Sequence, residues 1–381
     1  MNAIQHLSDS NPFLNQIKLL HHLDRLSEWQ QTGQTRPVLL EINLSSVCNQ
    51  ACRWCISSFS HVSNPAMSKA EKEAKKSSGC SSKWIDVQHL ERFVDEAQAF
   101  GVKAVNWSGG GEPTVHPQFT DIALFTSGKL EQGLMTNGQF PKKYVSIIGE
   151  NMRWVRISLD TFDAEKYHYH RYSSQFCQIL ENIRLLTYHS AEVGLNMNIA
   201  EFNMDEIVDF ARRSRDLGVA YVQFRPILGL PFELREDAPY KNQLGQSLLP
   251  KIKEALQQAK TYETDTFKVH ISWDKFQDIE NVEGNYGRFY KACEGHHFVC
   301  VVDANGEMDV CMYHLGEKAF RLGNIYEKSL PDIWASAERA ATIKHCRESI
   351  DFDKCQVCCK QHVINQFLHQ LAQPIQNVNF L

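Results

Sequence analysis

The stretch "LLEINLSSVCNQACRWC" (residues 39–55) joins an apolar run to three closely spaced cysteines. The run, which extends over 36–45, has the composition of a buried strand. Cys48, Cys52 and Cys55 follow it, and the next cysteine along the chain is Cys80. Tetrahedral zinc and iron–sulfur clusters both take four ligands. We therefore expect a metal or cluster site directly after the first strand, with one ligand position that this loop does not fill.

Three interpretations of this loop are open. Three thiolates on one short loop can hold three irons of a [4Fe–4S] cluster and leave the fourth iron without a protein ligand. The loop can also form a zinc site that a distant residue completes. Finally, the cysteines can simply be buried as small apolar side chains. The spacing of Cys48, Cys52 and Cys55 favours the cluster.

Composition limits the class of protein. The 381 residues are 43% hydrophobic and 22% charged, with a formal net charge of −5, which is typical of a globular chain with one large domain and an appendage, or two domains. This charge gives no reason to bind nucleic acid or an anionic membrane. No apolar run reaches the length of a membrane span, and the N-terminus lacks the order of a signal peptide. We expect a cytoplasmic protein whose twelve cysteines serve metal or redox chemistry instead of disulfides.

Strand-like and helix-like segments alternate along the first part of the chain. Strands are predicted at 36–45, 102–110, 130–138, 152–160, 192–200 and 220–228, with helices at 84–101, 117–128, 141–149, 175–189 and 203–217. Such alternation indicates a parallel sheet with helices outside, closed or partly closed as a barrel. In such barrels the loops after the strands carry the chemistry.

We therefore predict an α/β fold: a partial (βα)6 TIM-like barrel with a small C-terminal cysteine-rich α+β cluster-binding domain. The expected parts are a helical lead-in (1–35), the barrel (36–235) with a mobile loop at 57–83, a connector (236–289) with a helix near 245–262 and a strand at 266–272, the cluster-binding domain (290–360) and a C-terminal helix or tail (361–381).

A second motif lies at the end of the second predicted strand, "SGGGEPT" (108–114). Together with Cys-x3-Cys-x2-Cys after the first strand, it resembles the radical S-adenosylmethionine (SAM) superfamily. The resemblance implies that the amino and carboxylate groups of SAM chelate the open iron and that Trp54 lies beside its adenine. It also implies that the backbone of Gly109, Gly110 and Gly111 holds the methionine ammonium, with Glu112 as the acid of the motif.

Further SAM contacts are expected at three other strand ends. "MTNG" (135–138) and "RISLD" (156–160) end the third and fourth strands, where similar enzymes contact ribose and methionine. Asn137, Ser158 and Asp160 are the candidates there, and a purely structural role is the alternative for each. Arg225, at the end of the sixth strand, is a candidate for a carboxylate of SAM or substrate, with a salt bridge at the barrel rim as its alternative. No residue is assigned as catalytic.

The C-terminal region resembles the SPASM/Twitch extension of radical SAM enzymes, which binds auxiliary iron–sulfur clusters. Cys293, twelve residues, Gly306, four residues and Cys311 fit its first half, and Cys355-x2-Cys358 fits its second. The resemblance implies one auxiliary [4Fe–4S] cluster, as in the Twitch form, held by Cys293, Cys311, Cys355 and Cys358. A structural zinc on the same thiolates is the alternative. Whether Cys300, Cys346 or Cys359 replaces one ligand stays open, and Cys80 and Cys177 receive no role.

The resemblance implies an enzyme that cleaves SAM reductively to a 5′-deoxyadenosyl radical, which abstracts hydrogen from a substrate. An external one-electron donor such as flavodoxin or ferredoxin is expected, and the auxiliary cluster is expected to accept an electron in a net oxidation. About 35 residues precede the first strand, too few for the peptide-recognition domain of many peptide-modifying members. The main expectation is therefore a small-molecule substrate of the sugar, cyclitol or nucleotide type.

Two alternatives remain. The first is a maturase that modifies a ribosomally made peptide by cross-linking, epimerisation or decarboxylation. The second is a non-catalytic two-cluster electron carrier. The open coordination position beside a glycine-rich loop argues against the carrier, since a carrier protects its cluster.

Overall fold

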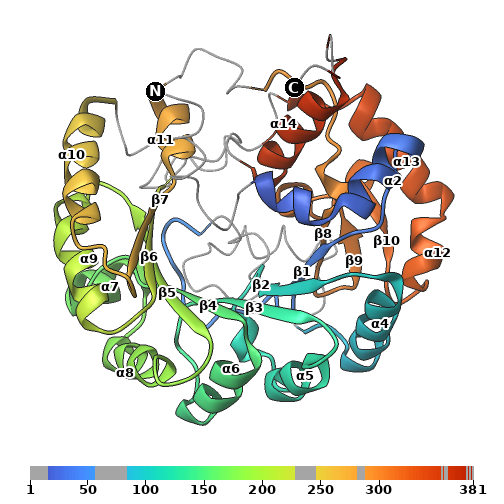
Figure 1. The fold of residues 1–381 in the computed structure, drawn as a ribbon. Helices are drawn as coiled ribbons and strands as arrows, with labels where there is room; N and C mark the ends of the chain where they lie inside the picture. The colour runs from blue at the N-terminus through green and yellow to red at the C-terminus, as the bar shows by residue number, and fades with distance from the viewer. Residues whose placement is uncertain are drawn as a thin grey trace, which may run out of the picture.

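The computed structural model describes residues 16–55, 84–227, 246–280, 288–352, 355, 359–374, 376 and 379. These residues form one curved sheet with the strand order β10-β9-β8-β1-β2-β3-β4-β5-β6-β7, surrounded by helices (Figure 1). From β8 through β1 to β7 all neighbouring strands are parallel, and β9 and β10 are added antiparallel. The predicted α/β fold with a partial barrel and a C-terminal cysteine-rich region is confirmed.

The strands are β1 (Leu39–Asn43), β2 (Ala104–Ser108), β3 (Glu131–Thr136), β4 (Trp154–Ser158), β5 (Glu192–Ile199), β6 (Tyr221–Pro226), β7 (Lys268–Ile271), β8 (Val299–Val302), β9 (Glu307–Asp309) and β10 (Arg321–Asn324). The α-helices are α2 (Leu23–Thr32), α4 (Val87–Phe100), α5 (Phe119–Thr126), α6 (Val145–Asn151), α7 (Ala164–Arg171), α8 (Phe176–Leu186), α9 (Ile207–Asp216), α10 (Leu249–Lys260), α11 (Trp273–Glu280), α12 (Leu330–Trp334), α13 (Ala337–Glu348) and α14 (Lys360–Ala372). Short 3-10 helices are η1 (Gln16–His21), η2 (Pro113–Val115), η3 (Lys142–Tyr144), η4 (Met204–Glu206), η5 (Gln246–Leu248), η6 (Gly295–His297), η7 (Met312–His314) and η8 (Lys318–Phe320).

The parallel sheet extends beyond the six predicted strands on both sides. Strand β7, from the predicted connector, pairs in parallel with β6, and β8, from the cysteine-rich region, pairs in parallel with β1. The cysteine-rich region is therefore built directly onto the first strand of the barrel. Helix α7 was not predicted, and the expected loop at 57–83 lies outside the described residues.

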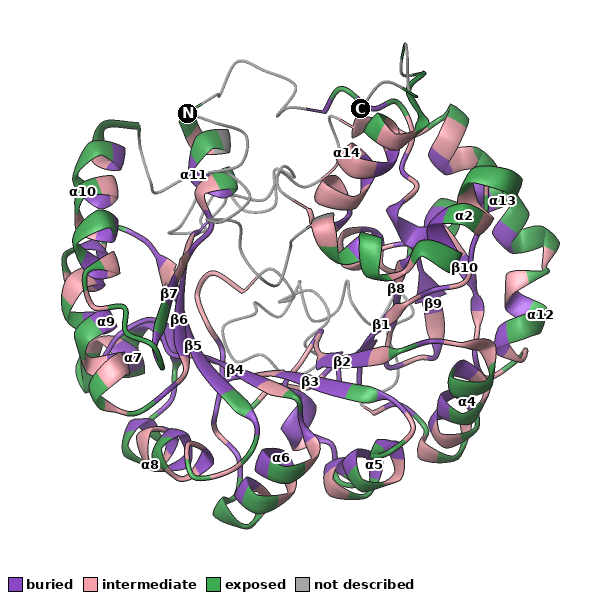
Figure 2. Cartoon of the chain, viewed as in Figure 1, coloured by how far each residue is buried: buried purple, intermediate pink, exposed green. Residues whose placement is uncertain are grey.

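Helix α4 illustrates how the sequence defines these elements. The Asp86 side chain accepts a hydrogen bond from the backbone N–H of His89 and caps the first turn. Apolar residues at helical spacing, Leu90, Phe93, Val94 and Ala97, are buried against the sheet. The helix ends at Gly101, whose φ of 92° lies in the left-handed region that favours glycine. Figure 2 shows the same pattern around the ring, with helices exposed on their outer faces and strands mostly buried.

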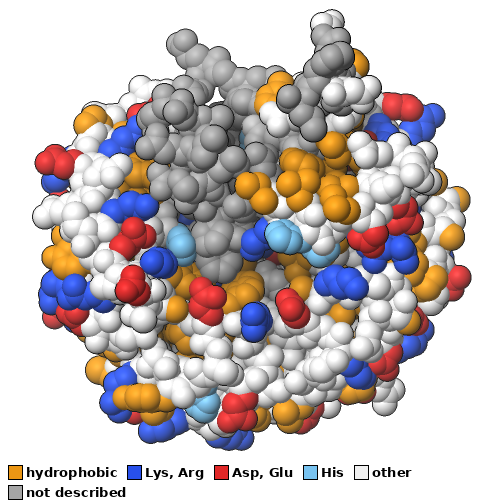
Figure 3. Space-filling view, viewed as in Figure 1, with side chains coloured by type: hydrophobic (Ala, Val, Ile, Leu, Met, Phe, Trp, Pro, Cys, Tyr) orange, Lys and Arg blue, Asp and Glu red, His pale blue; other side chains and the backbone are white. Residues whose placement is uncertain are grey.

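The N-terminal segment packs against the C-terminal region. Leu19 and Leu26 form a small buried cluster with Phe298 and Leu368 of α14. No helix in the described ranges is long and apolar enough to cross a bilayer. The space-filling view shows acidic and basic side chains interspersed on the visible face, without a large field of one sign (Figure 3).

Candidate functional site

Most of the predicted cofactor residues line one cavity of about 700 Å³ inside the barrel and at the carboxyl ends of its strands. The predicted residues in its wall are Cys48, Cys52, Trp54, Cys55, Gly109, Gly110, Gly111, Glu112, Asn137, Ser158 and Arg225. They come from the loops or ends of β1, β2, β3, β4 and β6. Strand-end loops are where barrels of parallel strands carry their functional residues. Asp160 is not part of this wall.

The cysteine loop and the glycine loop pack directly on each other. The backbone N–H of Gly111 donates to the Ser45 carbonyl at 2.7 Å, and that of Glu112 donates to the Val47 carbonyl at 2.9 Å. A Cβ on Gly111 would lie 2.1 Å from the Val47 carbonyl oxygen, and one on Gly109 would lie 1.8 Å from the Gly111 carbonyl oxygen. These two glycines are therefore required by contacts within the protein, in addition to the ligand approach that the sequence predicts.

Glu112 ties the glycine loop to the end of β3. Its carboxylate accepts hydrogen bonds from the hydroxyls of Thr114 and Thr136 at 2.7 and 2.6 Å and from the Asn137 N–H at 2.7 Å. Burial raises the pKa of this carboxyl, and the hydrogen bonds oppose that rise. Glu112 thus contacts other protein groups: its hydrogen bonds connect the loop after β2 to the loop after β3.

Asn137 and the backbone N–H of Gln50 lie beside the sulfur of Cys48. The Asn137 side-chain amide donates to Asn49 Oδ1 at 2.7 Å and lies 3.7 Å from Cys48 Sγ. The Gln50 N–H lies 3.4 Å from the same sulfur. Hydrogen bonds to ligand sulfurs are among the factors that set cluster potentials. Asn137 therefore both orients the loop and modifies the environment of a predicted ligand.

Arg171 is a site residue that sequence reasoning missed. Its guanidinium forms a buried ion pair with Asp160, and Nη1 lies 3.2 Å from Gln50 Oε1 and 3.6 Å from Cys52 Sγ. Its carbonyl accepts a hydrogen bond from the Ala51 N–H at 3.1 Å. Asp160 therefore does not line the cavity itself, but it binds Arg171, which does. The polar segment that forms α7 has no apolar periodicity, so nothing in the sequence pointed to Arg171.

Trp54 lies beside other aromatic rings. Its ring stacks on Phe202 with centroids 5.3 Å apart and approaches His170 at 5.6 Å. These contacts fix the indole, which also lines the cavity. The predicted position beside an adenine is therefore an ordered aromatic surface.

The thiols fit an iron–sulfur cluster. Burial raises the pKa of Cys48 well above its ordinary value, and burial also raises that of Cys52 although the Arg171 guanidinium opposes the rise. The thiolate form needs a positive partner at such a site, which iron ions provide. Three thiols in one cavity wall, with N–H donors directed at two of the sulfurs, are the donor set that such a cluster takes.

A second group of cysteines lines a separate small cavity in the C-terminal region. Cys293, Cys311, Cys355 and Cys359 form its wall. The first three are predicted auxiliary ligands, whereas Cys358 lies outside the described residues. Burial and the neighbouring Cys359 raise the pKa of Cys355 to about 11. In the described ranges no three His, Cys, Asp or Glu side chains form a group that would hold a single metal ion.

The other C-terminal cysteines differ in position. Cys346 adjoins the group, since its carbonyl accepts a hydrogen bond from the Cys293 N–H at 3.0 Å. Cys300 is buried in β8 and does not line the cavity. Of the three cysteines left open by the sequence, Cys359 is the one that the structure brings to the predicted ligands. Cys177 is exposed on α8.

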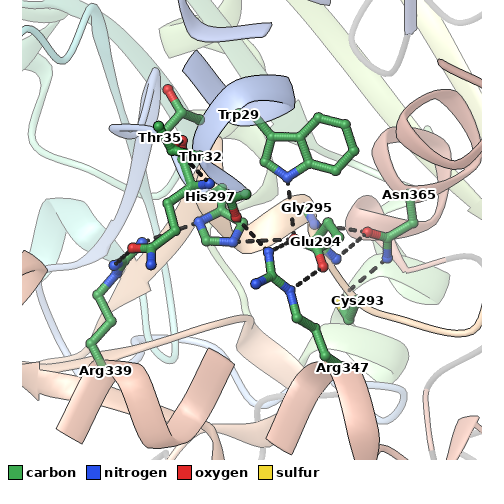
Figure 4. Close-up of polar contacts among 12 residues, drawn as sticks. Trp29, Thr32, Thr35, Cys293, Glu294, Gly295, His297, Arg339, Arg347 and Asn365 are labelled. Atoms are coloured by element: carbon green, nitrogen blue, oxygen red, sulfur yellow. Dashed lines mark hydrogen bonds and ion pairs between the residues drawn. The ribbon is translucent and has the colours of Figure 1, made fainter. Parts of the chain in front are cut away.

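A polar network fixes the backbone beside Cys293 (Figure 4). Glu294 binds Arg347 with contacts of 2.6 and 2.8 Å, accepts from the Trp29 indole at 3.2 Å, and lies 3.2 Å from His297 Nε2. Burial raises the pKa of Glu294, but the hydrogen bonds and charges of Arg347 and His297 together outweigh it, so that this pKa lies well below its ordinary value. This network joins helices α2 and α13 to the segment that carries Cys293.

Asn365 of α14 completes the same network. Its Oδ1 accepts from the N–H groups of Glu294 and Gly295, each at 2.7 Å, and its amide nitrogen lies 3.3 Å from Cys293 Sγ. The position of this sulfur is therefore set by hydrogen bonds from three separate elements.

We expect Glu294→Gln to lower the free energy of unfolding by about 2 kcal/mol, because it removes the charge of a partly buried ion pair and leaves Arg347 poorly compensated. Chemical denaturation of the metal-free chain measures this. The matched control is Glu181→Gln, which removes an exposed pair with Arg184 and should change the free energy of unfolding far less. Equal, small effects of the two substitutions would contradict the assigned role of the network.

Comparisons with known proteins agree with this geometry. The family model of the radical SAM superfamily matches residues 42–214, and that of SPASM, an iron–sulfur cluster-binding domain, matches residues 293–360. The chain is 23% identical over 292 residues to the molybdenum cofactor biosynthesis protein moc-5 of Caenorhabditis elegans, covering 74% of this chain and 45% of that protein. It is 27% identical over 284 residues to the antilisterial bacteriocin subtilosin biosynthesis protein AlbA of Bacillus subtilis (strain 168), covering 71% and 58%. The chain thus spans about half the length of these two relatives.

Among solved structures, SuiB of Streptococcus suis bound to S-adenosylmethionine superposes with a TM-score of 0.64 at 16% identity, over 91% of this chain and 76% of that one. The complex of SuiB with its precursor peptide SuiA gives a TM-score of 0.63 over 93% and 76%. At this identity the likeness shows the fold alone. With the two family matches and the cysteine, glycine and strand-end residues gathered around one cavity, the chain belongs to the radical SAM superfamily and carries a C-terminal SPASM iron–sulfur cluster-binding domain.

Proposed function

We propose that this radical SAM enzyme is a maturase that oxidises a residue of a ribosomally made peptide. The proposal of an oxidation rests on one observation: the same cavity is lined by residues from both cysteine regions. Met312 and Tyr313, next to Cys311, and Lys360, next to Cys359, line the same cavity as Cys48. A substrate bound there lies between the site where hydrogen is removed and a site that can accept an electron.

The peptide substrate replaces the small molecule as our leading proposal. AlbA is named for the biosynthesis of a bacteriocin, and SuiB binds a precursor peptide. These comparisons support the peptide alternative better than the small-molecule expectation, although moc-5 belongs to the biosynthesis of a small cofactor. Because the chain is a radical SAM enzyme, the alternative of a non-catalytic electron carrier is not pursued.

The residues of the first site have distinct proposed roles. When bound, a [4Fe–4S] cluster with SAM supplies a 5′-deoxyadenosyl radical that removes a hydrogen atom from an unreactive carbon. Cys48, Cys52 and Cys55 hold three irons of that cluster. The glycine loop exposes backbone groups to SAM, and Arg171 and Asn137 fix the loop that carries the cysteines.

The second site is proposed to hold one auxiliary [4Fe–4S] cluster on four thiolates, with Cys293, Cys311 and Cys355 among them. Removal of one hydrogen atom leaves a carbon radical on the substrate. A net two-electron oxidation requires that a second electron and a proton then leave. A protein-ligated cluster is a suitable electron acceptor, because its potential is adjusted by hydrogen bonds and burial. An external flavodoxin or ferredoxin is the proposed source of the electron that starts turnover.

The test uses the full chain after anaerobic reconstitution with iron and sulfide. Synthetic peptides encoded by short reading frames next to the gene are incubated with SAM and a reductant. We expect equal amounts of 5′-deoxyadenosine and of a peptide lighter by two hydrogen masses, measured by liquid chromatography and mass spectrometry. Reactions without SAM are the control. If sugars or nucleotides are converted and the peptides stay unchanged, the maturase proposal is wrong and a small-molecule substrate is supported instead.

A further inference from the structure

Two arginines face the cavity from β4 and β6. Alternate side chains of a strand point to the same face, and Arg156 with Ser158 on β4, and Gln223 with Arg225 on β6, all line the cavity wall. Arg156 is buried, whereas Arg225 is partly exposed to the cavity. In Figure 1, β5 and β6 lie across the ring from β1 and β2, whose loops carry the cysteines and glycines.

Of the acidic side chains in the described part of the cavity wall, Glu41 and Glu112 are bound to other residues and Glu131 is exposed. Glu41 forms an ion pair with Lys360 and accepts from Asn106 at 3.1 Å. Glu112 is held by the hydrogen bonds described above, and Glu131 is exposed at the start of β3. The side chain of Arg225 makes no hydrogen bond or ion pair with the described residues. Its charge therefore faces the cavity.

Arg156 strengthens this positive region. Its Nη1 donates to Gln223 Oε1 at 2.7 Å, and its Nη2 lies 2.9 Å from Met135 Sδ, so that the guanidinium is held in one orientation. Burial, and second the nearby Arg225, lower the pKa of Arg156 to about 10. It stays charged at neutral pH, and the two like charges repel each other. An anion beside both would relieve that repulsion, and guanidinium groups match carboxylates in a bidentate geometry.

A different arginine stands at the predicted SAM site. Arg171 lies 3.6 Å from Cys52 Sγ and lines the cavity beside the cysteine loop. The predicted SAM site therefore has a guanidinium of its own, which is paired with Asp160. Arg156 and Arg225 come from β4 and β6, which are separated in the sheet from β1 and its cysteine loop.

We propose that Arg225, supported by Arg156, binds a carboxylate of the peptide substrate. The group is either an Asp or Glu side chain or the C-terminal carboxylate. This inference rests on the proposed maturase function, whose substrate class it narrows. Arg225 is a binding residue in this role, and the carboxylate it holds fixes which carbon of the peptide faces the radical.

The experiment measures binding without turnover. Reconstituted holoenzyme with saturating SAM is titrated anaerobically in a calorimeter with three probes: N-acetyl-glutamate α-amide, which has only a side-chain carboxylate; N-acetyl-alanine, which has only a terminal one; and N-acetyl-glutamine amide, which is neutral. We expect saturable binding of one carboxylate probe and none of the neutral probe. Arg225→Gln should weaken that binding at least tenfold, and Arg225→Lys should retain part of it.

Two controls make the result specific. Arg184→Gln, on the exposed face of α8, should bind the probe like the unaltered chain. The affinity for SAM should be the same in Arg225→Gln as in the unaltered chain. If neither carboxylate probe binds, if Arg225→Gln binds it normally, or if that variant loses SAM instead, the proposal is wrong. The calorimetric test does not require peptide turnover. It can therefore be interpreted if the maturase assay fails, and the maturase assay can be interpreted if no carboxylate probe binds.

Discussion

Replacing Cys48, Cys52 and Cys55 together by Ala is expected to abolish 5′-deoxyadenosine formation and to lower bound iron from about eight to about four atoms per chain, since each [4Fe–4S] cluster holds four. The three thiols occupy one loop after β1, and the C-terminal cysteines line a different cavity. Loss of the first cluster should therefore leave the second in place. Iron and sulfide assays on the anaerobically reconstituted chain measure this.

The matched control for this variant is Cys177→Ala, which removes an exposed thiol on α8 and should change neither iron content nor SAM cleavage. An unaltered chain that binds only about four irons together with zinc would contradict the auxiliary cluster. A triple variant that still cleaves SAM would contradict the assignment of the first cluster to these cysteines.

The fold was largely predictable because its main signal is local. Each barrel strand is a short apolar run followed by an amphipathic helix, and both periodicities can be read from single segments. A strand at 266–272 could be predicted from the sequence, but only the pairing of β7 with β6 shows that it continues the parallel sheet of the barrel. Helix α7 is mostly polar, and it is defined by the Asp163 cap instead of an apolar stripe.

The site was predictable where a motif spacing carried it and not where tertiary contacts did. The cysteine spacing and the glycine run identify two loops that the fold brings together. The role of Asp160, however, depends on its ion pair with Arg171, and that pair depends on the unpredicted α7. Likewise, spacing selected Cys358 as an auxiliary ligand, whereas the neighbouring Cys359 is the cysteine that the structure describes in the cavity wall.

The second large effect is expected at this auxiliary site. Replacing Cys311 and Cys359 together by Ala should reduce formation of the oxidised peptide to background and leave SAM cleavage measurable. The radical is made at the cysteine loop after β1, so the first half of turnover does not need the second site. The substrate radical, in contrast, loses its electron acceptor, and it can then only recover a hydrogen atom or decay.

A comparison with Cys358→Ala decides which of the two neighbouring cysteines is the fourth ligand. Bound iron should fall to about four atoms per chain, one cluster, in the Cys311 and Cys359 variant, and the electron paramagnetic resonance signal of the first cluster should persist. Cys358→Ala alone is the matched control, because it removes the adjacent thiol, and it should keep both clusters if Cys359 is the ligand. Loss of the auxiliary cluster in Cys358→Ala would instead support the pair predicted from spacing. Normal peptide oxidation without the auxiliary cluster would show that its role is structural. Loss of SAM cleavage with an intact first cluster would show that the C-terminal region shapes the SAM site. Met312 and Tyr313, which line the same cavity as Cys48, would be the residues that connect the two.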